Sequence, residues 1–216
     1  MSIEAYRQII EGLFAELDIA NQWGRLSAKL HTVCSFNPSK AIVSSLSKDT
    51  TVSFVEMASV SENGYISKME PRTLGDVLKG SYTYFSEGDI IIAKITPCME
   101  NGKCAVAKGL TNGIGFGSSE FHVIHCSDDI RTKFLFGYLN RESIRRKAAS
   151  VMTGASGHRR VPISFYENIE IPKLTLKEQD EMIAKMEAIE TQIHEAEERL
   201  EALTGKTADI LNQYLN

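Results

Sequence analysis

The sequence of 216 residues lacks any apolar run long enough to cross a membrane. Its apolar runs are short, as at Ile90 to Ala93, whereas a spanning helix needs about 20 such residues. The N-terminus also lacks the basic and then apolar segments of a signal peptide. With 43% hydrophobic and 24% charged residues, the composition is typical of a globular protein. We therefore expect a cytoplasmic protein with no membrane partner.

Cysteine is scarce and is not arranged for metal or disulfide chemistry. The four cysteines, Cys34, Cys98, Cys104 and Cys126, include no C-x-x-C pair and no repeating spacing. Such a pattern argues against a disulfide framework and against a cysteine-built zinc site. Buried free thiols in a reducing compartment are the default expectation.

Sequence motifs of catalysis are missing as well. No G-x-x-x-x-G-K-[ST] run is present to wrap a phosphate. The five prolines are never adjacent, which excludes the Pro-Pro-aromatic loop of a base-flipping methyltransferase. Ile92 stands two residues before Lys94, where the strand of a metal-dependent nuclease would carry an acid. These absences predict a protein that is not an enzyme and that holds no cofactor.

Three weaker candidates favour structural roles. The run from Gly113 to Gly117 lacks the spacing of a phosphate loop, and it predicts a tight turn or bulge. His122 and His125 would point to opposite faces of a strand, which makes joint zinc ligation awkward. Ser156 and His158 have no evident orienting acid, so they indicate a loop and not a nucleophile with its base. We expect no metal site and no catalytic residue.

Charge is segregated along the chain, although the net charge is only −4. Residues 1–20 sum to −3, residues 21–174 to +5 and residues 175–216 to −6. Within 131–160 there are eight basic residues and one acidic residue. A local basic excess of this kind is typical of a surface that binds a polyanion. A solvated basic face is the equally weighted alternative.

The C-terminal segment predicts a long helix. From Met182 to Tyr214, positions spaced alternately by four and three are apolar, except Thr207, as in a coiled-coil seam. Thr175 and Glu178 have the spacing of a capping box, so we expect a coiled-coil spacer helix over 175–216, about 60 Å long. The seam positions that we assign to dimer contacts are Met182, Met186, Ile189, Ile193, Leu200, Leu203 and Ile210.

A second, shorter helix is predicted at 1–20, where apolar residues follow the same spacing from Ile3 to Ala20. It should pack on the spacer helix, because an apolar stripe needs a partner. The seam at 182–214 is longer than this helix can cover. The excess predicts a second copy of the chain, and thus a homodimer.

The middle of the chain, residues 21–174, predicts an α+β domain with a twisted mixed sheet. Short β-like runs are separated by the turn signals Asn63-Gly64, Asn101-Gly102 and Asn112-Gly113. Around 131–149 the apolar spacing becomes helical, and 168–172 reads as a last strand before the spacer helix.

Two polar loops in this domain suit nucleic-acid binding. The first, Lys94 to Lys103, presents Thr96 and Asn101, and asparagine and lysine can read base edges in the major groove. The second runs from Thr153 to Arg160, where glycines permit close backbone approach and hydroxyl and guanidinium groups suit phosphates. Ordinary surface turns are the alternative. The second loop and the helix before it supply the phosphate-contact candidates Ser156, Gly157, His158, Arg159, Arg160, Arg145, Arg146 and Lys147.

The motifs together resemble a known family. The segments Asp89-IIIAKITPCMENGK, Gly115-FGSSEFHVI and Phe54-VEMASV resemble the target recognition domain of specificity subunits of type I restriction-modification systems. The segment Gly157-HRRVPISFYENIEIPKLTLKEQ is similar to that family's junction between recognition domain and spacer helix. The resemblance implies a DNA-facing surface at Gly157 to Arg160 and Lys94 to Lys103, and Ser118 and Ser119 are further DNA-binding candidates. It extends over nearly the whole chain.

The resemblance also implies function and partners. Such subunits are non-catalytic readers of double-stranded DNA that hold two methyltransferase subunits and, for restriction, motor-nuclease subunits. A usual member has two recognition domains and two long helices, whereas one of each is expected here. The chain therefore resembles half a subunit that reads one half of a bipartite target. Two alternatives stay open: the recognition portion of a fused restriction-methylation enzyme, and a coiled-coil adaptor that binds protein.

Overall fold

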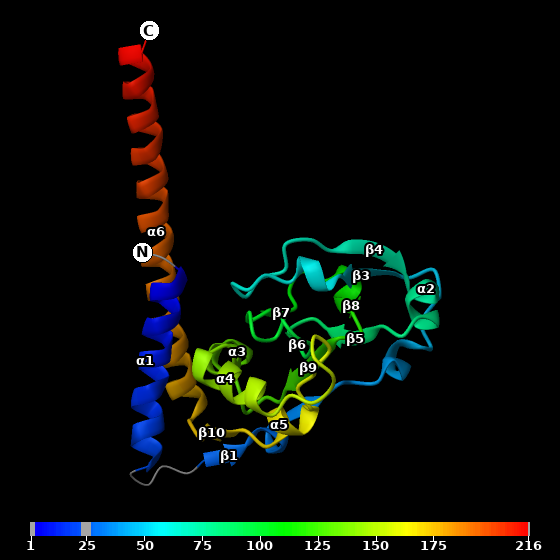
Figure 1. Ribbon diagram of the computed structural model, residues 1–216. Helices are drawn as coiled ribbons and strands as arrows, with labels where there is room; N and C mark the ends of the chain where they lie inside the picture. Colours follow the sequence, from blue (N-terminus) through cyan, green and yellow to red (C-terminus); the bar gives the residue numbers. More distant parts are fainter. Residues whose placement is uncertain (1–2, 23–26, 216) are drawn as a thin grey trace.

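The computed structural model describes residues 3–22 and 27–215. It has the α+β fold that the sequence predicts, with a long helix at each end of a mixed β domain (Figure 1). In chain order the helices and strands are α1 (Ile3–Gln22), β1 (Ser27–Lys29), η1 (Leu30–Thr32), β2 (Cys34–Phe36), η2 (Lys40–Val43), β3 (Thr51–Val55), η3 (Met57–Ser59), β4 (Glu70–Thr73), α2 (Leu74–Lys79), β5 (Thr83–Ser86), β6 (Ile90–Ala93), β7 (Cys104–Val106), η4 (Thr111–Gly113), β8 (Ile114–Gly117), β9 (Phe121–Cys126), α3 (Thr132–Leu139), α4 (Glu142–Ser150), α5 (Ile163–Glu167), β10 (Glu170–Pro172) and α6 (Leu176–Leu215).

The strands form two four-stranded sheets and one two-stranded ribbon. The first sheet has the order β2-β9-β6-β7 and is antiparallel throughout. The second has the order β4-β3-β8-β5, in which β3 and β8 are parallel and the other pairs are antiparallel. Strands β1 and β10 pair where the chain leaves α1 and where it enters α6. The ribbon therefore ties the two ends of the β domain together beside the helices.

Three apolar clusters hold these layers together. Side chains such as Ile91 and Phe85 fill the space between the two sheets. Ile90 and Ile92 point to the opposite face of β6, where they pack against the helical cluster around Phe134. A third cluster with Phe116 lies under α2 on the outer side of the second sheet. Side chains alternate between the two faces of a strand. Strand β6 is apolar at every position because both of its faces are covered.

Strand β8 corrects the prediction of a tight turn or bulge at Gly113–Gly117. Gly113 does lie in a turn, with φ of 68°, but Ile114–Gly117 is a fully buried strand. A Cβ on Gly115 would lie 2.1 Å from the ring of Phe85, and a Cβ on Gly117 would lie 2.5 Å from the carbonyl oxygen of Val55. These glycines are needed because the neighbouring strand and ring lie too close for any side chain.

The helices α1, α3 and α6 meet at a small residue. Gly137 on α3 would place a Cβ 2.8 Å from the sulfur of Met186 on α6 and 3.4 Å from the ring of Phe14 on α1. Figure 1 shows α1 running antiparallel along the first part of α6, while the second part of α6 extends beyond it. The absence of a side chain at Gly137 thus lets both long helices approach the β domain through α3.

The seam prediction is corrected for part of α6. Met182, Met186 and Ile193 are buried inside this single chain, with exposed fractions of 7%, 1% and 7%, so their neighbours belong to the same chain and not to a second copy. Ile189 is half-buried, and Leu203 is 60% exposed. The side chains of Leu200 and Ile210 lie outside the described residues.

Candidate nucleic-acid interface

The two polar loops expected to bind DNA lie side by side. The backbone N–H of Thr96 donates to the carbonyl of Arg159 over 3.0 Å, and that of Val161 donates to the carbonyl of Lys94 over 2.9 Å. Thr153 and Arg160 exchange two further backbone hydrogen bonds, which close the second loop. The loops are more than 50 residues apart in sequence, yet they form one continuous surface. We call the loops 94–103 and 153–160, with the turn 118–120, the loop surface.

The turn 118–120 between β8 and β9 joins the loop surface through Glu120. Its carbonyl accepts from the N–H of Lys94 over 2.9 Å. Its carboxylate binds the Arg160 guanidinium at two points, over 2.9 and 2.7 Å, and this pairing lowers the pKa of the Glu120 carboxyl. Ser118 accepts from the Glu120 N–H, whereas Ser119 is exposed. Sequence reasoning missed Glu120 because a carboxylate is not an expected DNA contact; its partner Arg160 is 40 residues away.

The tip of the second loop is open to solvent. Residues 153–158 are all exposed, including Ser156, Gly157 and His158. Gly154 and Gly157 have φ of 120° and 79°, a conformation that glycine adopts without strain. A Cβ on Gly154 would lie 2.8 Å from the carbonyl oxygen of His158. The tip therefore presents backbone and small polar groups that a phosphate could approach closely.

The five arginine and lysine residues among the predicted phosphate contacts do not have equivalent environments. Arg146 and Lys147 on α4 are exposed, and Arg146 pairs with Glu142 one turn earlier. Arg145 is half-buried and donates to the carbonyl of Asn140, and burial lowers its guanidinium pKa. The Arg159 guanidinium donates to the carbonyls at 149 and 152, which anchors the loop to the end of α4. Arg146 and Lys147 are thus exposed to solvent, whereas Arg145 and Arg159 form hydrogen bonds that hold the loop surface in place.

The residues of the first loop likewise divide into exposed side chains and side chains that hold the loop in place. Asn101 is exposed, while Lys94 and Thr96 are half-buried. Thr96 donates to the carboxylate of Glu100 over 3.3 Å, within the same turn. The Lys103 ammonium donates to the carbonyl of Met57 over 3.1 Å, so it braces the loop against η3. Among the predicted base-reading residues, Asn101 is the one whose side chain is exposed at the loop tip.

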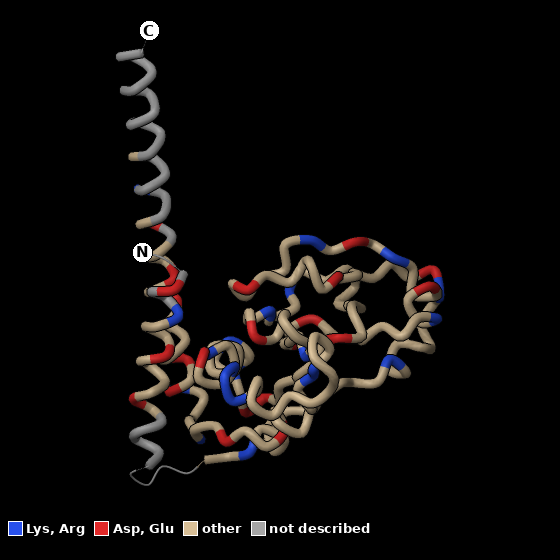
Figure 2. The backbone as a smooth tube through the Cα atoms, in the orientation of Figure 1, with Lys and Arg blue, Asp and Glu red and all other residues tan. Residues whose placement is uncertain are grey.

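Two basic residues of the segment 131–160 form ion pairs with α6 instead of belonging to the loop surface. Arg131 pairs with Asp180 at 2.8 Å, and Lys133 pairs with Glu187 and Glu190 at 3.2 and 2.8 Å. Figure 2 shows acidic positions along the described parts of the two long helices and basic positions on α4. Arg131 and Lys133 therefore pair with carboxylates of α6, and the basic residues left for a polyanion lie on α4 and the loops.

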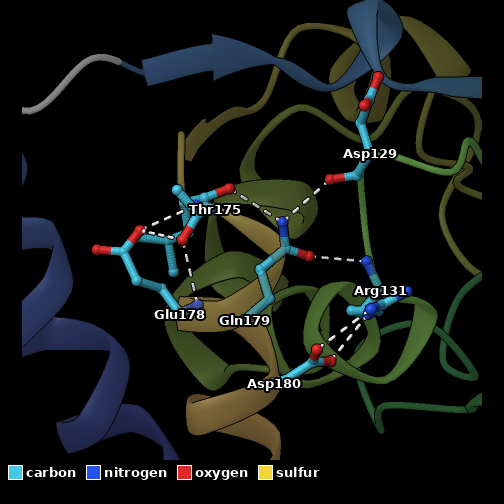
Figure 3. Close-up of polar contacts among 7 residues, drawn as sticks. Asp129, Arg131, Thr175, Glu178, Gln179 and Asp180 are labelled. Atoms are coloured by element: carbon cyan, nitrogen blue, oxygen red, sulfur yellow. Dashed lines mark hydrogen bonds and ion pairs between the residues drawn. The ribbon is translucent and has the colours of Figure 1, made fainter.

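The junction between the β domain and α6 is built around Gln179, which is only 3% exposed (Figure 3). Its amide oxygen accepts from the backbone N–H of Arg131 over 2.7 Å. Its amide nitrogen donates to the carbonyls of Asp129 and Leu174 over 3.0 and 3.1 Å. One side chain thus satisfies three backbone groups from the chain before α3 and the chain before α6.

The start of α6 carries the capping box that the sequence predicts. The Thr175 hydroxyl accepts from the N–H of Glu178 over 3.3 Å, and the Glu178 carboxylate accepts from the N–H of Thr175 over 2.9 Å (Figure 3). Together with Gln179, this cap fixes where α6 begins on the β domain.

Two other expectations are that the chain has no metal site and no membrane-spanning helix. His122 is buried with its Nε2 at 2.8 Å from the carbonyl of Val161, whereas His125 contacts Asp89 at 2.6 Å, so the two histidines have separate partners, as the alternation predicts. Within the described residues, no group of three or more potential ligands could hold a metal ion. No described helix is both long and apolar enough to cross a membrane.

Comparisons with known proteins show which proteins the chain resembles. The specificity subunit of the type I restriction enzyme EcoAI from Escherichia coli is 43% identical over 136 residues, which cover 62% of this chain and 23% of that protein. The specificity subunit of EcoEI, also from Escherichia coli, is 36% identical over 145 residues, covering 66% and 24%. No family model matches the chain. Over these residues the chain is similar to specificity subunits of type I restriction enzymes.

Solved structures agree with this fold. The HsdS subunit from Thermoanaerobacter tengcongensis superposes with a TM-score of 0.66 at 22% identity, covering 87% of this chain and 47% of that one. A chain from a structure of a type I restriction-modification system superposes with a TM-score of 0.57 at 15% identity, covering 94% and 51%. The chain therefore spans about a quarter of the length of its curated relatives and about half that of the solved chains. Both curated relatives are named as specificity subunits, and the expectation that this chain is not itself an enzyme stays a prediction.

Proposed function

We propose that the chain reads one half of a bipartite DNA target through its loop surface and supports methyltransferase subunits through its helices. The observation that carries the proposal is the union of the loops 94–103 and 153–160 by backbone hydrogen bonds. Their exposed groups match the two kinds of DNA contact: an amide that can read base edges, and cations with glycine-rich backbone that suit phosphates. Residues 21–174 act as the recognition domain, and 175–216 act as the spacer helix.

The loop environments divide the DNA contacts into two tasks. Lys147 and Arg146 are exposed on α4, so they contact phosphates and contribute affinity without sequence preference. Asn101 is exposed at the tip of the first loop and reads a base edge. Arg159 and Lys103 donate to backbone carbonyls, so they support the loops and affect DNA binding indirectly.

Binding titrations with the chain and the methyltransferase subunit of the same system test this division. Lys147→Ala should weaken all DNA sequences about equally and lower the salt slope by about one unit. Asn101→Ala should relax preference at particular base pairs by about 1–3 kcal/mol if its contact is bidentate. Lys79→Ala is the matched control, since Lys79 is exposed but pairs with Asp76 on α2. An equal, sequence-independent loss for Lys147→Ala and Asn101→Ala would contradict the assignment.

The partners follow from the proposal. They are double-stranded DNA, methyltransferase subunits, a motor-nuclease subunit where restriction is carried out, and a second copy of this chain in the same cytoplasm. The acidic face of α6 and the part of its seam beyond α1 are the surfaces offered to protein partners. A protein-binding adaptor would instead show no salt-sensitive DNA affinity with the methyltransferase present. The recognition part of a fused enzyme would bind DNA, with its catalytic domains elsewhere in the polypeptide.

A further inference from the structure

Two cysteines face each other across the edge of the first sheet. In the antiparallel pair of β2 and β9, Cys34 is the direct partner of Cys126. The flanking backbone bonds run from Ser127 N–H to the Val33 carbonyl and from Asn37 N–H to the Val123 carbonyl. Hydrogen-bonded and non-hydrogen-bonded pairs alternate along such a ladder, so Cys34 and Cys126 occupy a non-hydrogen-bonded position. Side chains approach most closely there, with Cα atoms about 4.5 Å apart.

This register suits a disulfide. A disulfide requires Cα atoms about 4.4–6.8 Å apart and Cβ atoms that face each other, and a directly opposed pair on one face of a sheet meets both conditions. Both thiols are free and only half-buried, and β2 is an edge strand, so a small reagent can reach them. Cys104 is buried in β7 and Cys98 lies in the first loop, so neither is opposed to another cysteine.

The two thiols differ in their surroundings. The pKa of the Cys126 thiol is lowered by a hydrogen bond from the Cys34 thiol and, to a smaller extent, by the Thr132 hydroxyl and the nearby His125. The pKa of the Cys34 thiol is raised by its role as donor to Cys126 and by burial. Thiolates, and not thiols, attack disulfides. Thr132 and His125 lie beside Cys126 and not beside Cys34, so we assign Cys126 as the attacking thiol and Cys34 as the resolving thiol.

We propose that Cys34 and Cys126 form a dithiol modification site that low-molecular-weight disulfides convert into an internal disulfide. The Cys126 thiolate attacks one sulfur of the reagent, forms a mixed disulfide and releases one reagent thiolate. Cys34 loses its proton and attacks the Cys126 sulfur, which releases the second reagent thiolate. One reagent disulfide is reduced to two thiols while one protein disulfide forms. The inference does not depend on the proposed function.

The new bond would tie together two parts of the molecule. Strand β2 follows β1 and the segment that leads out of α1, and β9 leads through 127–131 into α3 and the Gln179 junction. Cross-linking β2 to β9 would therefore hold the N-terminal segment on the sheet against opening at its edge. We expect the oxidised form to melt at a higher temperature and to show slower hydrogen exchange in β2.

The test uses oxidised glutathione as the probe on the full chain, followed by mass spectrometry and thiol counting. In the wild-type protein, Cys34 and Cys126 should lose two thiols and two hydrogen masses, retain no glutathione on either residue, and recover fully with a reductant. Cys34→Ser should instead accumulate one glutathione on Cys126, because no resolving thiol is present. Cys126→Ser should likewise form no internal disulfide under the same conditions.

Cys98→Ser is the matched control, and it should form the internal disulfide as the wild type does. Stable glutathione on Cys34 or Cys126 of the wild-type chain, or a protein disulfide mapped to Cys98 by peptide analysis, would overturn the proposal. So would unchanged thiol counts after exposure to the probe in protein whose circular dichroism shows the native fold.

Discussion

At the scale of single residues, Gly117 shows how close packing dictates residue choice. A Cβ there would lie 2.5 Å from the Val55 carbonyl oxygen, and a backbone atom in a central strand cannot move aside. Gly117→Ala should therefore lower the free energy of unfolding by about 1–3 kcal/mol, the usual cost of overpacking. Chemical denaturation measures this.

Gly12→Ala on α1 is the control, because nothing lies within 4 Å of its added Cβ. Replacing a glycine inside a helix with alanine should raise the free energy of unfolding by about 0.5–1 kcal/mol. Equal effects of the two substitutions would show that space at Gly117 is not the limiting factor.

His122 predicts a pH dependence of stability. Burial lowers its pKa below the usual value of about 6.5, and its Nε2–H donates to Val161 while Nδ1 faces the Asn37 amide. Below about pH 6.5 the unfolded chain takes up a proton that the folded chain does not. Stability should therefore fall as pH falls from about 6.5, until the folded pKa is reached.

Thermal melts between pH 5 and 8 test this. His122→Gln should flatten the curve over the interval just below pH 6.5. The exposed His158→Gln serves as the control and should keep the wild-type curve. A wild-type melting temperature that rises on acidification through this interval would contradict the buried neutral imidazole.

The histidines also illustrate what sequence can supply at this scale. Their separation onto opposite faces follows from the two-residue period of a strand, and the structure confirms it. The partners of His122 and His125, Val161 and Asp89, are 39 and 36 residues away. Such partners depend on the tertiary fold, which no local pattern specifies.

At the scale of elements, short sequence motifs correctly predict those features that depend only on residues close in the sequence. The capping box at Thr175 and Glu178 needs only three residues of spacing, and it is present. Strand β8 was misread because its glycines look like turn residues, whereas they are explained by Phe85 and Val55 in neighbouring strands. The candidate loops were predicted from composition, but their union through Thr96 and Arg159 requires long-range backbone pairing.

The Gln179 junction gives a prediction at this scale. Gln179→Ala would leave the Arg131 N–H and the Asp129 and Leu174 carbonyls without their bonds, and each buried unsatisfied group costs about 1–3 kcal/mol. We expect a clear loss of stability and a broader distribution of spin-label distances between α6 and the β domain. Gln179→Glu should be intermediate, because an ionised carboxylate still accepts from Arg131 but cannot donate.

Asp180→Asn is the neighbouring control. Asp180 pairs with Arg131 at the surface, where both side chains are about half exposed, so its loss should cost at most about 1 kcal/mol. A Gln179→Ala variant with the stability and distance distribution of Asp180→Asn would mean that the junction is held by packing alone.

At the scale of the whole molecule, periodicity predicted an apolar stripe on α6 but not which surface covers it. The early seam residues Met182 and Met186 pack inside the chain, where α1 and α3 reach them. Farther along, Leu203 is 60% exposed, and α6 continues past the end of α1. A second copy or a methyltransferase subunit is thus expected on the later part of the helix, and full burial of a leucine there would contribute roughly 1.5–3 kcal/mol.

Sedimentation equilibrium at several concentrations, with and without methyltransferase, tests this arrangement. Leu203→Asp should weaken association without changing the free energy of unfolding of the β domain, because the Leu203 side chain is 60% exposed. Met186→Asp should instead destabilise the single chain, since it places a charge in the cluster beside Gly137 and Phe14. In a dimer related by a two-fold axis, the length of α6 would set the distance between the two recognition domains. A seven-residue insertion in α6 beyond Leu203 should therefore change the preferred spacing between the two DNA half-sites. The sequence preferred at each half-site should stay unchanged. A strict monomer in both mixtures, with Leu203→Asp indistinguishable from the wild type, would rule out the later seam as an interface.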